Sequence, residues 1–231
     1  MSVRRKMLAA VATLMLIGIV SAAGTLSATA ATPACGPHCI SIFSKELGTD
    51  KQPGPVEDVL DGNASVDQPV ILKQGSGSDN SQDFIPTGGH VVSDFYKSGM
   101  VSADVNSHYS SLRAAQIEFA PGGKPSGFCV GLAKVAYENE GLTLRPCSVP
   151  ALTVWIIDTA DSPSTAAAGY FPIVNASTTD FSSPFAMDLP QNEVANHQTL
   201  QIHVSQLQFS SDKTLPDRQL WGAHFGVVTQ S

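Results

Sequence analysis

The chain has 231 residues, of which 19 are glycine and 15 are proline, and a formal net charge of −7. This length fits one domain or at most two. The acidic balance argues against nucleic acids and anionic membranes as partners, because both are bound through patches of lysine and arginine.

The N-terminus has the pattern of a secretory signal peptide. Three basic residues within the first six precede an apolar run from Met7 to Gly24, and Ala28-Thr29-Ala30 fits the cleavage pattern. A membrane anchor is the alternative, because the apolar run is near the lower length limit for spanning a bilayer. We predict that residues 1–30 are removed, which takes the formal net charge from −7 to −10, because they carry three basic residues and no acid. The mature protein, residues 31–231, is then secreted and extracellular, without an integral membrane segment.

Four cysteines follow the predicted signal. Behind such a signal an even number of cysteines indicates disulfides, and we predict the local pairings, Cys35–Cys39 and Cys129–Cys147, among the three possible ones. The second bond closes a hairpin-sized loop and is expected to contribute roughly 3 kcal/mol. The alternative for Cys35, His38 and Cys39 is a metal site, but a closed zinc site needs a fourth ligand. We expect no metal and no cofactor.

From Ile40 onward the chain has the pattern of an all-β protein. Short apolar runs alternate with Gly, Pro, Asn, Asp and Ser, and the spacing of an amphipathic helix is missing from nearly every segment. A turn of helix is expected only between Val92 and Val105. The segment from Pro86 to Arg113 is predicted to be an insertion between two β units.

Three aromatic triplets recur along the chain, at spacings of 71 and 66 residues between their last members. Residues two apart on a strand share a face, so the first and third residues of a triplet point inward together. We predict that the aromatic residues fill the centre of a threefold core and that the glutamines satisfy buried backbone groups. The triplets are Gln82-Asp83-Phe84, Thr153-Val154-Trp155 and Gln219-Leu220-Trp221.

Two further alignments support three repeats. Ahead of the first triplet stands Val70-Ile71-Leu72, and a similar segment, Leu142-Thr143-Leu144, stands ahead of the second. The second alignment is a shared spacing of 12 residues, from Ile117 to Cys129 and from Ile173 to Phe185. We predict repeats over about 38–98, 113–158 and 168–231 within a single domain, 31–231, that is a monomer.

The chain resembles the ricin-type β-trefoil lectin family in several of these motifs. They are Cys129-Val130, Leu144-Arg145-Pro146-Cys147 and the triplets that end in Phe84, Trp155 and Trp221. The resemblance implies a β-trefoil: three pseudo-repeats of four strands, six of which form a short closed barrel while six cap it. Closure of the barrel removes exposed sheet edges.

The resemblance also implies a sugar site. That family binds sugars with an Asp two residues after the first cysteine position, an aromatic platform, and an Asn or Gln just before the triplet aromatic. Gly131 stands at the Asp position of the second repeat and Met187 at that of the third, whereas the first repeat offers Asp61 with Asn80 and Gln82. These last three are the candidate carbohydrate-binding residues, although no ring stands at the platform position.

Each candidate also has a structural interpretation. Asp61-Gly62-Asn63 is typical of a turn, and a glutamine in a triplet is typically a core amide. We expect a glycan or polysaccharide as the partner and no catalytic activity. The alternative is a non-lectin β-trefoil that binds a protein through loops such as the Pro86–Arg113 insertion. A hydrolase is the third possibility, and it requires two carboxylates that converge on a cleft.

Overall fold

The computed structural model describes residues 36, 38–48, 54–76, 78–88, 90–190 and 200–225. The predicted signal peptide, residues 1–30, lies outside the described residues, and so does Cys35 of the predicted Cys35–Cys39 pair. Within the described ranges, no helix is both long and apolar enough to cross a bilayer.

The strands fall into three successive groups of four, which we call repeats 1, 2 and 3. Repeat 1 contains β1 (Ile40–Ser44), β2 (Val56–Val59), β3 (Val70–Lys73) and β4 (Phe84–Thr87). Repeat 2 contains β5 (Arg113–Phe119), β6 (Phe128–Gly131), β8 (Thr143–Pro146) and β9 (Trp155–Ile157). Repeat 3 contains β10 (Ile173–Asn175), β11 (Phe185–Asp188), β13 (His203–Gln206) and β14 (Trp221–Phe225). Two short strands, β7 (Glu140–Gly141) and β12 (Leu200–Gln201), join hairpins of different repeats.

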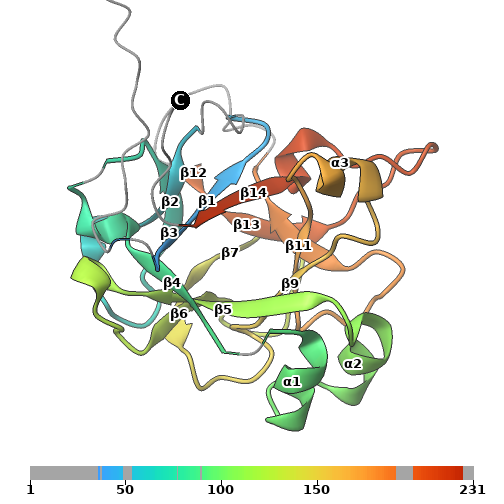
Figure 1. The fold of residues 1–231 in the computed structure, drawn as a ribbon, viewed down its shortest axis with the longest axis horizontal. Helices are drawn as coiled ribbons and strands as arrows, with labels where there is room; N and C mark the ends of the chain where they lie inside the picture. Colours follow the sequence, from blue (N-terminus) through green and yellow to red (C-terminus); the bar gives the residue numbers. More distant parts are fainter. Residues whose placement is uncertain are drawn as a thin grey trace, which may run out of the picture.

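The first and fourth strands of the repeats form a closed barrel (Figure 1). Antiparallel pairing runs from β14 to β1, β4, β5, β9 and β10. A bridge between Phe171, just before β10, and Trp221 of β14 completes the circle. The barrel strands therefore have no open edge, which is the arrangement that protects a β protein from edge-to-edge aggregation.

The second and third strands form three hairpins that meet at one end of the barrel. They are the pairs β2–β3, β6–β8 and β11–β13. A cycle of backbone hydrogen bonds joins the hairpins where their third strands begin. Val70 N–H, in β3, donates to Leu142, just before β8 (2.9 Å); Leu142 N–H donates to Ile202, just before β13 (2.7 Å); and Ile202 N–H donates back to Val70 (3.1 Å). Three residues in one closed cycle occupy equivalent places in a threefold structure. The fold is therefore a β-trefoil, which confirms the predicted fold class.

The triplet aromatics lie in the core, as expected. The exposed fractions of Phe84, Trp155 and Trp221 are 0%, 1% and 0%. The indole N–H of Trp155 donates to the backbone oxygen of Val130 and that of Trp221 to Met187, each over 2.8 Å. A buried indole needs such an acceptor. The Cys129–Cys147 disulfide is present and ties β6 to the segment after β8.

The Pro86–Arg113 insertion contains more helix than the sequence analysis expected. It holds α1 (Val92–Lys97) and α2 (Ala103–Tyr109), which lie together beside β5 (Figure 1). The hydroxyl of Ser102 caps α2 by accepting from the backbone of Val105. A third short helix, α3 (Pro163–Ala167), begins at a proline. These helices span two turns or fewer, so their sequences show little periodicity.

Repeat 1 also buries an acid in the core. Glu57 is 2% exposed, and one of its carboxylate oxygens accepts from the backbone N–H of Ile42. The other oxygen has no hydrogen-bond partner among the described residues. Burial raises the pKa of Glu57 well above its ordinary value of 4.5.

The substitution Glu57→Gln is therefore expected to stabilise the protein at neutral pH by about 1–3 kcal/mol, because a neutral amide pays neither the desolvation of a buried carboxylate nor the cost of taking up a proton. A carboxyl whose pKa is raised by folding contributes stability below its unfolded pKa and loses that contribution as the pH rises through the folded pKa. The advantage of the variant should therefore shrink toward pH 4. Urea denaturation at pH 4 and pH 7 measures both values, and an equal difference at the two pH values would contradict the buried, protonatable state of Glu57.

Candidate functional site

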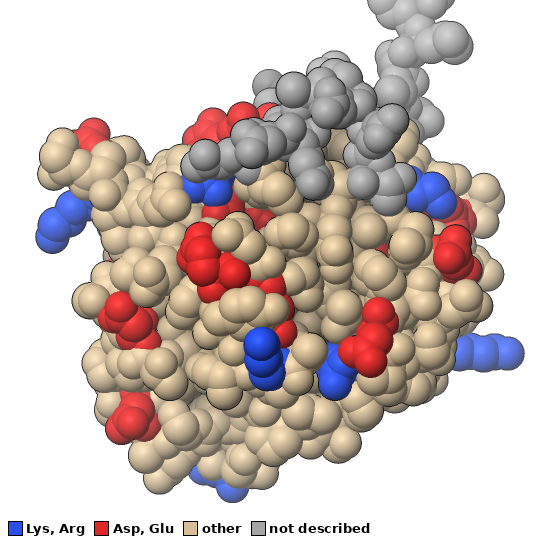
Figure 2. All heavy atoms as spheres, turned by 180° about the vertical axis from the view of Figure 1, so that it is seen from behind, with Lys and Arg blue, Asp and Glu red and all other residues tan. Residues whose placement is uncertain are grey.

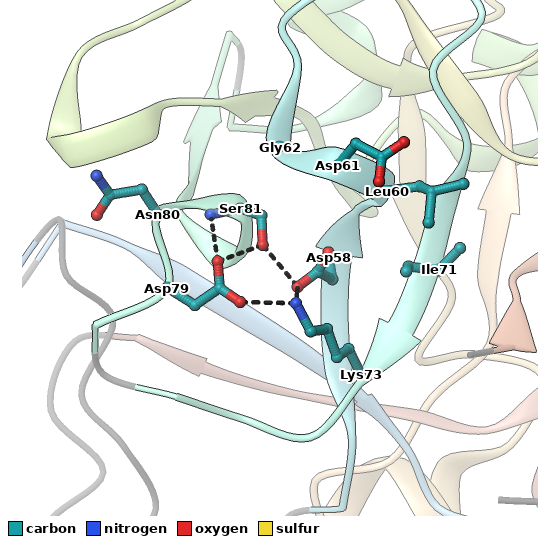
Figure 3. A pocket seen from close by; sticks show the side chains of 9 residues that line it. All are labelled: Asp58, Leu60, Asp61, Gly62, Ile71, Lys73, Asp79, Asn80 and Ser81. Carbon is teal, nitrogen blue, oxygen red and sulfur yellow. Dashed lines mark hydrogen bonds and ion pairs between the residues drawn. The ribbon is translucent and has the colours of Figure 1, made fainter. Parts of the chain in front are cut away.

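A pocket of about 560 Å³ opens on repeat 1 (Figure 3). Its walls come from β2, β3 and two single-turn 3-10 helices, η1 (Leu60–Gly62) and η2 (Asn80–Gln82). The lining residues are Asp58, Leu60, Asp61, Gly62, Ile71, Lys73, Asp79, Asn80 and Ser81. Seven of the nine are polar, charged or glycine, the other two are aliphatic, and none is aromatic.

Strand register identifies the equivalent positions in the three repeats. The residue after each member of the hydrogen-bonded cycle pairs across its hairpin with a residue of the second strand. These pairs are Ile71 with Asp58, Thr143 with Gly131, and His203 with Asp188. Because Gly131 stands two residues after Cys129, its equivalents Asp58 and Asp188 occupy the position at which the sequence resemblance implies an Asp.

The sequence alignment of the second strands was therefore wrong in two repeats. It placed Asp61 and Met187 at the acid position, and the structure places Asp58 and Asp188 there. The hairpins differ in length, so a distance counted in repeat 2 does not transfer to the others. A slip of one residue moves a strand's side chains to the opposite face, and in repeat 3 the slip is one residue, from Asp188 to Met187.

Asp58 is the deepest acid of the pocket, with an exposed fraction of 1%. Its Oδ2 accepts from the hydroxyl of Ser81 (2.7 Å) and lies 3.6 Å from Nζ of Lys73. Burial raises the pKa of Asp58, while the hydrogen bond from Ser81 and the charge of Lys73 oppose the shift.

Asp79 faces Asp58 across the same serine. Its carboxylate accepts from Lys73 (2.8 Å) and from the backbone N–H (3.1 Å) and hydroxyl (2.5 Å) of Ser81. These bonds, led by the one from Lys73, lower the pKa of Asp79 to about 2. The Ser81 hydroxyl has one proton, so it can donate to only one of the two carboxylates at a time. Asp79 is thus ionised throughout the ordinary pH range.

Two of the three sequence candidates line the pocket, and one does not. Asp61 is exposed at the rim, in a turn where its φ is 62°, so it is both a turn residue and a lining residue. Asn80 is exposed as well, and its side chain points away from the other polar side chains (Figure 3). Gln82 is buried: its amide accepts from Ser76 N–H (2.7 Å) and donates to the Gln74 oxygen (3.0 Å). Gln82 therefore fixes the backbone beside the pocket.

In repeat 3 the equivalent position is filled from within the chain. The guanidinium of Arg218 forms a salt bridge with Asp188 and donates to the side chain of Gln208 (2.7 Å). The Asp188 and Arg218 side chains are 3% and 13% exposed. Arg218 directly precedes Gln219 of the third triplet, just as Ser81 precedes Gln82 of the first. The short side chain of Ser81 thus leaves open the space that Arg218 fills.

In repeat 2 both the acid and the space are missing. A Cβ added to Gly131 would lie 2.8 Å from the backbone oxygen of Leu152 and 2.9 Å from the Thr153 side chain. The chain that leads into β9 therefore already occupies the place of an acidic side chain. Of the three equivalent positions, repeat 1 combines a buried acid with an open pocket.

The described acids do not form a metal site, since no group of three or more His, Cys, Asp or Glu side chains is arranged around a common point within the described ranges. The face shown in Figure 2 carries acidic and basic side chains interspersed among uncharged residues. No broad basic patch is visible on the described part of that face.

Comparison with known proteins finds likeness in structure alone. No protein-family model matches the chain, and no curated protein is similar to it in sequence. Among solved structures, a designed threefold-symmetric protein, ThreeFoil, is 16% identical, with a TM-score of 0.48, over 80% of this chain and 96% of that one. The C-terminal half of an earthworm R-type lectin in complex with GalNAc is 11% identical, with a TM-score of 0.44, over 82% and 99%. A ricin B-like lectin of Macrolepiota procera in complex with lactose is 12% identical, with a TM-score of 0.45, over 81% and 95%.

Proposed function

We propose that this protein is a secreted, monomeric carbohydrate-binding protein whose glycan site is the pocket of repeat 1. One observation carries the proposal. Among three equivalent positions, repeat 1 presents its acid, Asp58, in an open pocket, whereas Leu152 and Thr153 fill the space in repeat 2 and Arg218 fills it in repeat 3. A buried acid in a pocket that is open in one repeat of three fits a binding function better than a purely structural role.

The polar lining suits a ligand rich in hydroxyl groups. A carboxylate such as Asp58 accepts hydrogen bonds from neighbouring hydroxyls, and an ammonium such as Lys73 donates to sugar oxygens. We assign Asp61 and Asn80 to the rim, where they offer further contacts. Gln82 has a positioning role, because its amide bonds hold the backbone at Gln74 and Ser76.

Secretion is part of the proposal. The predicted signal peptide supports it, and so does the Cys129–Cys147 disulfide, because such bonds persist in oxidising compartments. N-terminal sequencing of the protein recovered from culture medium tests this point, and a mature N-terminus near residue 31 is the expected result.

The proposal is binding without catalysis. The pKa of Asp58 is raised and that of Asp79 is lowered, a division also found in glycosidase pairs. In this pocket, however, the two carboxylates share the Ser81 hydroxyl and the Lys73 ammonium. A glycosidase must place the scissile bond between its carboxylates, and here Ser81 lies between them. Release of reducing sugar from a bound polysaccharide would overturn this part of the proposal.

The substitution Asp58→Asn tests the site. It keeps the size of the side chain and removes its charge, so we expect glycan affinity to fall at least tenfold, about 1.4 kcal/mol. A glycan array selects the ligand and isothermal titration calorimetry measures the affinity. The matched control is Asp104→Asn on α2, which should bind as the unmodified protein does. Circular dichroism must show that both variants are folded.

Two results would contradict the proposal. One is a folded, unmodified protein that binds no glycan at high micromolar concentration. The other is an Asp58→Asn variant that binds as tightly as the unmodified protein, which would place the site elsewhere.

A further inference from the structure

The pocket carries an excess of negative charge. Three carboxylates, Asp58, Asp61 and Asp79, line it together with one ammonium, Lys73, which leaves a formal charge of −2. No lining residue is aromatic, so a sugar ring finds no flat surface on which to stack. Affinity in this pocket must therefore come from hydrogen bonds and charge, and an anionic sugar would be repelled.

The position equivalent to Asp58 already holds a cation in repeat 3. There the Arg218 guanidinium lies on the carboxylate of Asp188, which also accepts from the side-chain amide of Gln219 (3.0 Å). A cation therefore compensates this buried acid in one repeat. In repeat 1 the corresponding residue, Ser81, is neutral and short, so the compensating group has to come from elsewhere.

Lys73 provides that compensation only in part. Its Nζ is 3.6 Å from Asp58, beyond hydrogen-bonding distance, and 2.8 Å from Asp79, so its close partner is Asp79. The Lys73 side chain is 49% exposed and can move aside at little cost. The carboxylate of Asp61, exposed at the rim, takes part in none of the side-chain hydrogen bonds or ion pairs among the described residues. Asp58 and Asp61 are thus the carboxylates that remain for a ligand.

We propose that the pocket recognises an amino sugar with a free, protonated amine, as in oligomers of glucosamine. The inference rests on the proposed function and specifies its ligand class. The ligand's ammonium takes the place over Asp58 that the Arg218 guanidinium has over Asp188, and the neighbouring hydroxyls contact Asp61 and Lys73. N-acetylation removes the positive charge and adds bulk, so the acetylated sugar loses the ion pair.

The test compares three oligosaccharides of equal length by isothermal titration calorimetry: oligomers of glucosamine, of N-acetylglucosamine and of glucose. We expect the glucosamine oligomer to bind at least tenfold more tightly than the other two. If the N-acetylated or the glucose oligomer binds as well or better, the inference is overturned while the proposed function stands. If the protein binds no glycan at all, on an array as well as in the calorimeter, both are overturned.

Variants separate pocket binding from general attraction between an acidic protein and a cationic oligomer. Ser81→Arg puts into repeat 1 the residue that fills repeat 3, so glucosamine binding should be lost. Ser107→Arg on α2 makes the same change in charge at an exposed site remote from the pocket and should bind normally. Equal losses in the two variants would overturn the inference.

A third variant covers the case in which Ser81→Arg fails to fold. Asp61→Asn is conservative, because Asn tolerates the positive φ of this exposed turn. Because it changes the formal charge of the pocket from −2 to −1, it should lower the preference for the cationic glucosamine over N-acetylglucosamine several-fold. An unchanged preference would count against the inference. Putrescine, a diamine without a sugar ring, completes the test. If it binds as tightly as the glucosamine oligomer, the site recognises amines and the sugar specificity is refuted.

Discussion

Replacing Trp155 by alanine is expected to lower the free energy of unfolding by about 3–5 kcal/mol, the range for truncation of a buried tryptophan. The ring is 1% exposed and lies in the larger of the core clusters. The substitution also removes the donor to the backbone oxygen of Val130, which stays buried without that partner. Urea denaturation followed by circular dichroism measures the loss.

Tyr137→Ala is the matched control, because that ring is 45% exposed. Its effect should stay within about 0.5–1 kcal/mol, as for most surface substitutions. If Trp155→Ala left the unfolding midpoint unchanged, the triplets would not mark the centre of the barrel.

Replacing both Cys129 and Cys147 by serine is expected to cost about 3 kcal/mol, because the bond closes a loop of 18 residues in the unfolded chain. Cys129 is also fully buried, so its serine variant adds a cost for burying a hydroxyl. Denaturation of the unmodified protein with and without a reductant isolates the contribution of the bond. A reductant that opens the bond and leaves stability unchanged would contradict a stabilising role.

The fold could be predicted because its signals are local and repeated. Each triplet places a large aromatic residue two positions after its first member, and the alignment of Val70 with Leu142 matches the hydrogen-bonded cycle of the structure. Burial of one tryptophan is a weak signal, but three aromatic residues at comparable spacing indicate threefold symmetry. The α1–α2 insertion carried no such signal, since its helices are too short to establish a period.

The candidate site could be predicted only as far as its repeat. The turn sequence Asp61-Gly62-Asn63 makes Asp61 recognisable without any structure, whereas Asp58 lies within a strand whose register depends on the hairpin length. From the acid position to its hairpin partner there are 12 residues in repeat 2, 13 in repeat 1 and 15 in repeat 3. Counting back from Ile71 with the length found in repeat 2 ends at Val59, one residue from Asp58.

One informative signal was visible in the sequence. The residue before the triplet glutamine is Ser81 in repeat 1 and Arg218 in repeat 3. That difference in side-chain size determines which equivalent position is open. The difference can be interpreted only when it is known that each residue contacts the acid of the second strand in its own repeat. Ser81 is 23 residues from Asp58 along the chain, and Arg218 is 30 residues from Asp188. Local sequence patterns do not report contacts of this kind.

The most direct test of the central claim, that the repeat 1 pocket is a glycan site, is a titration of the ¹⁵N-labelled mature protein with the best-binding glycan, followed by NMR. The account predicts that the amide resonances of residues 58–62, 71–73 and 79–81 shift together and saturate with a single affinity. Resonances around Gly131 and Arg218 should stay in place. Shifts confined to the α1–α2 insertion, or to the Asp188–Arg218 region, would contradict the claim.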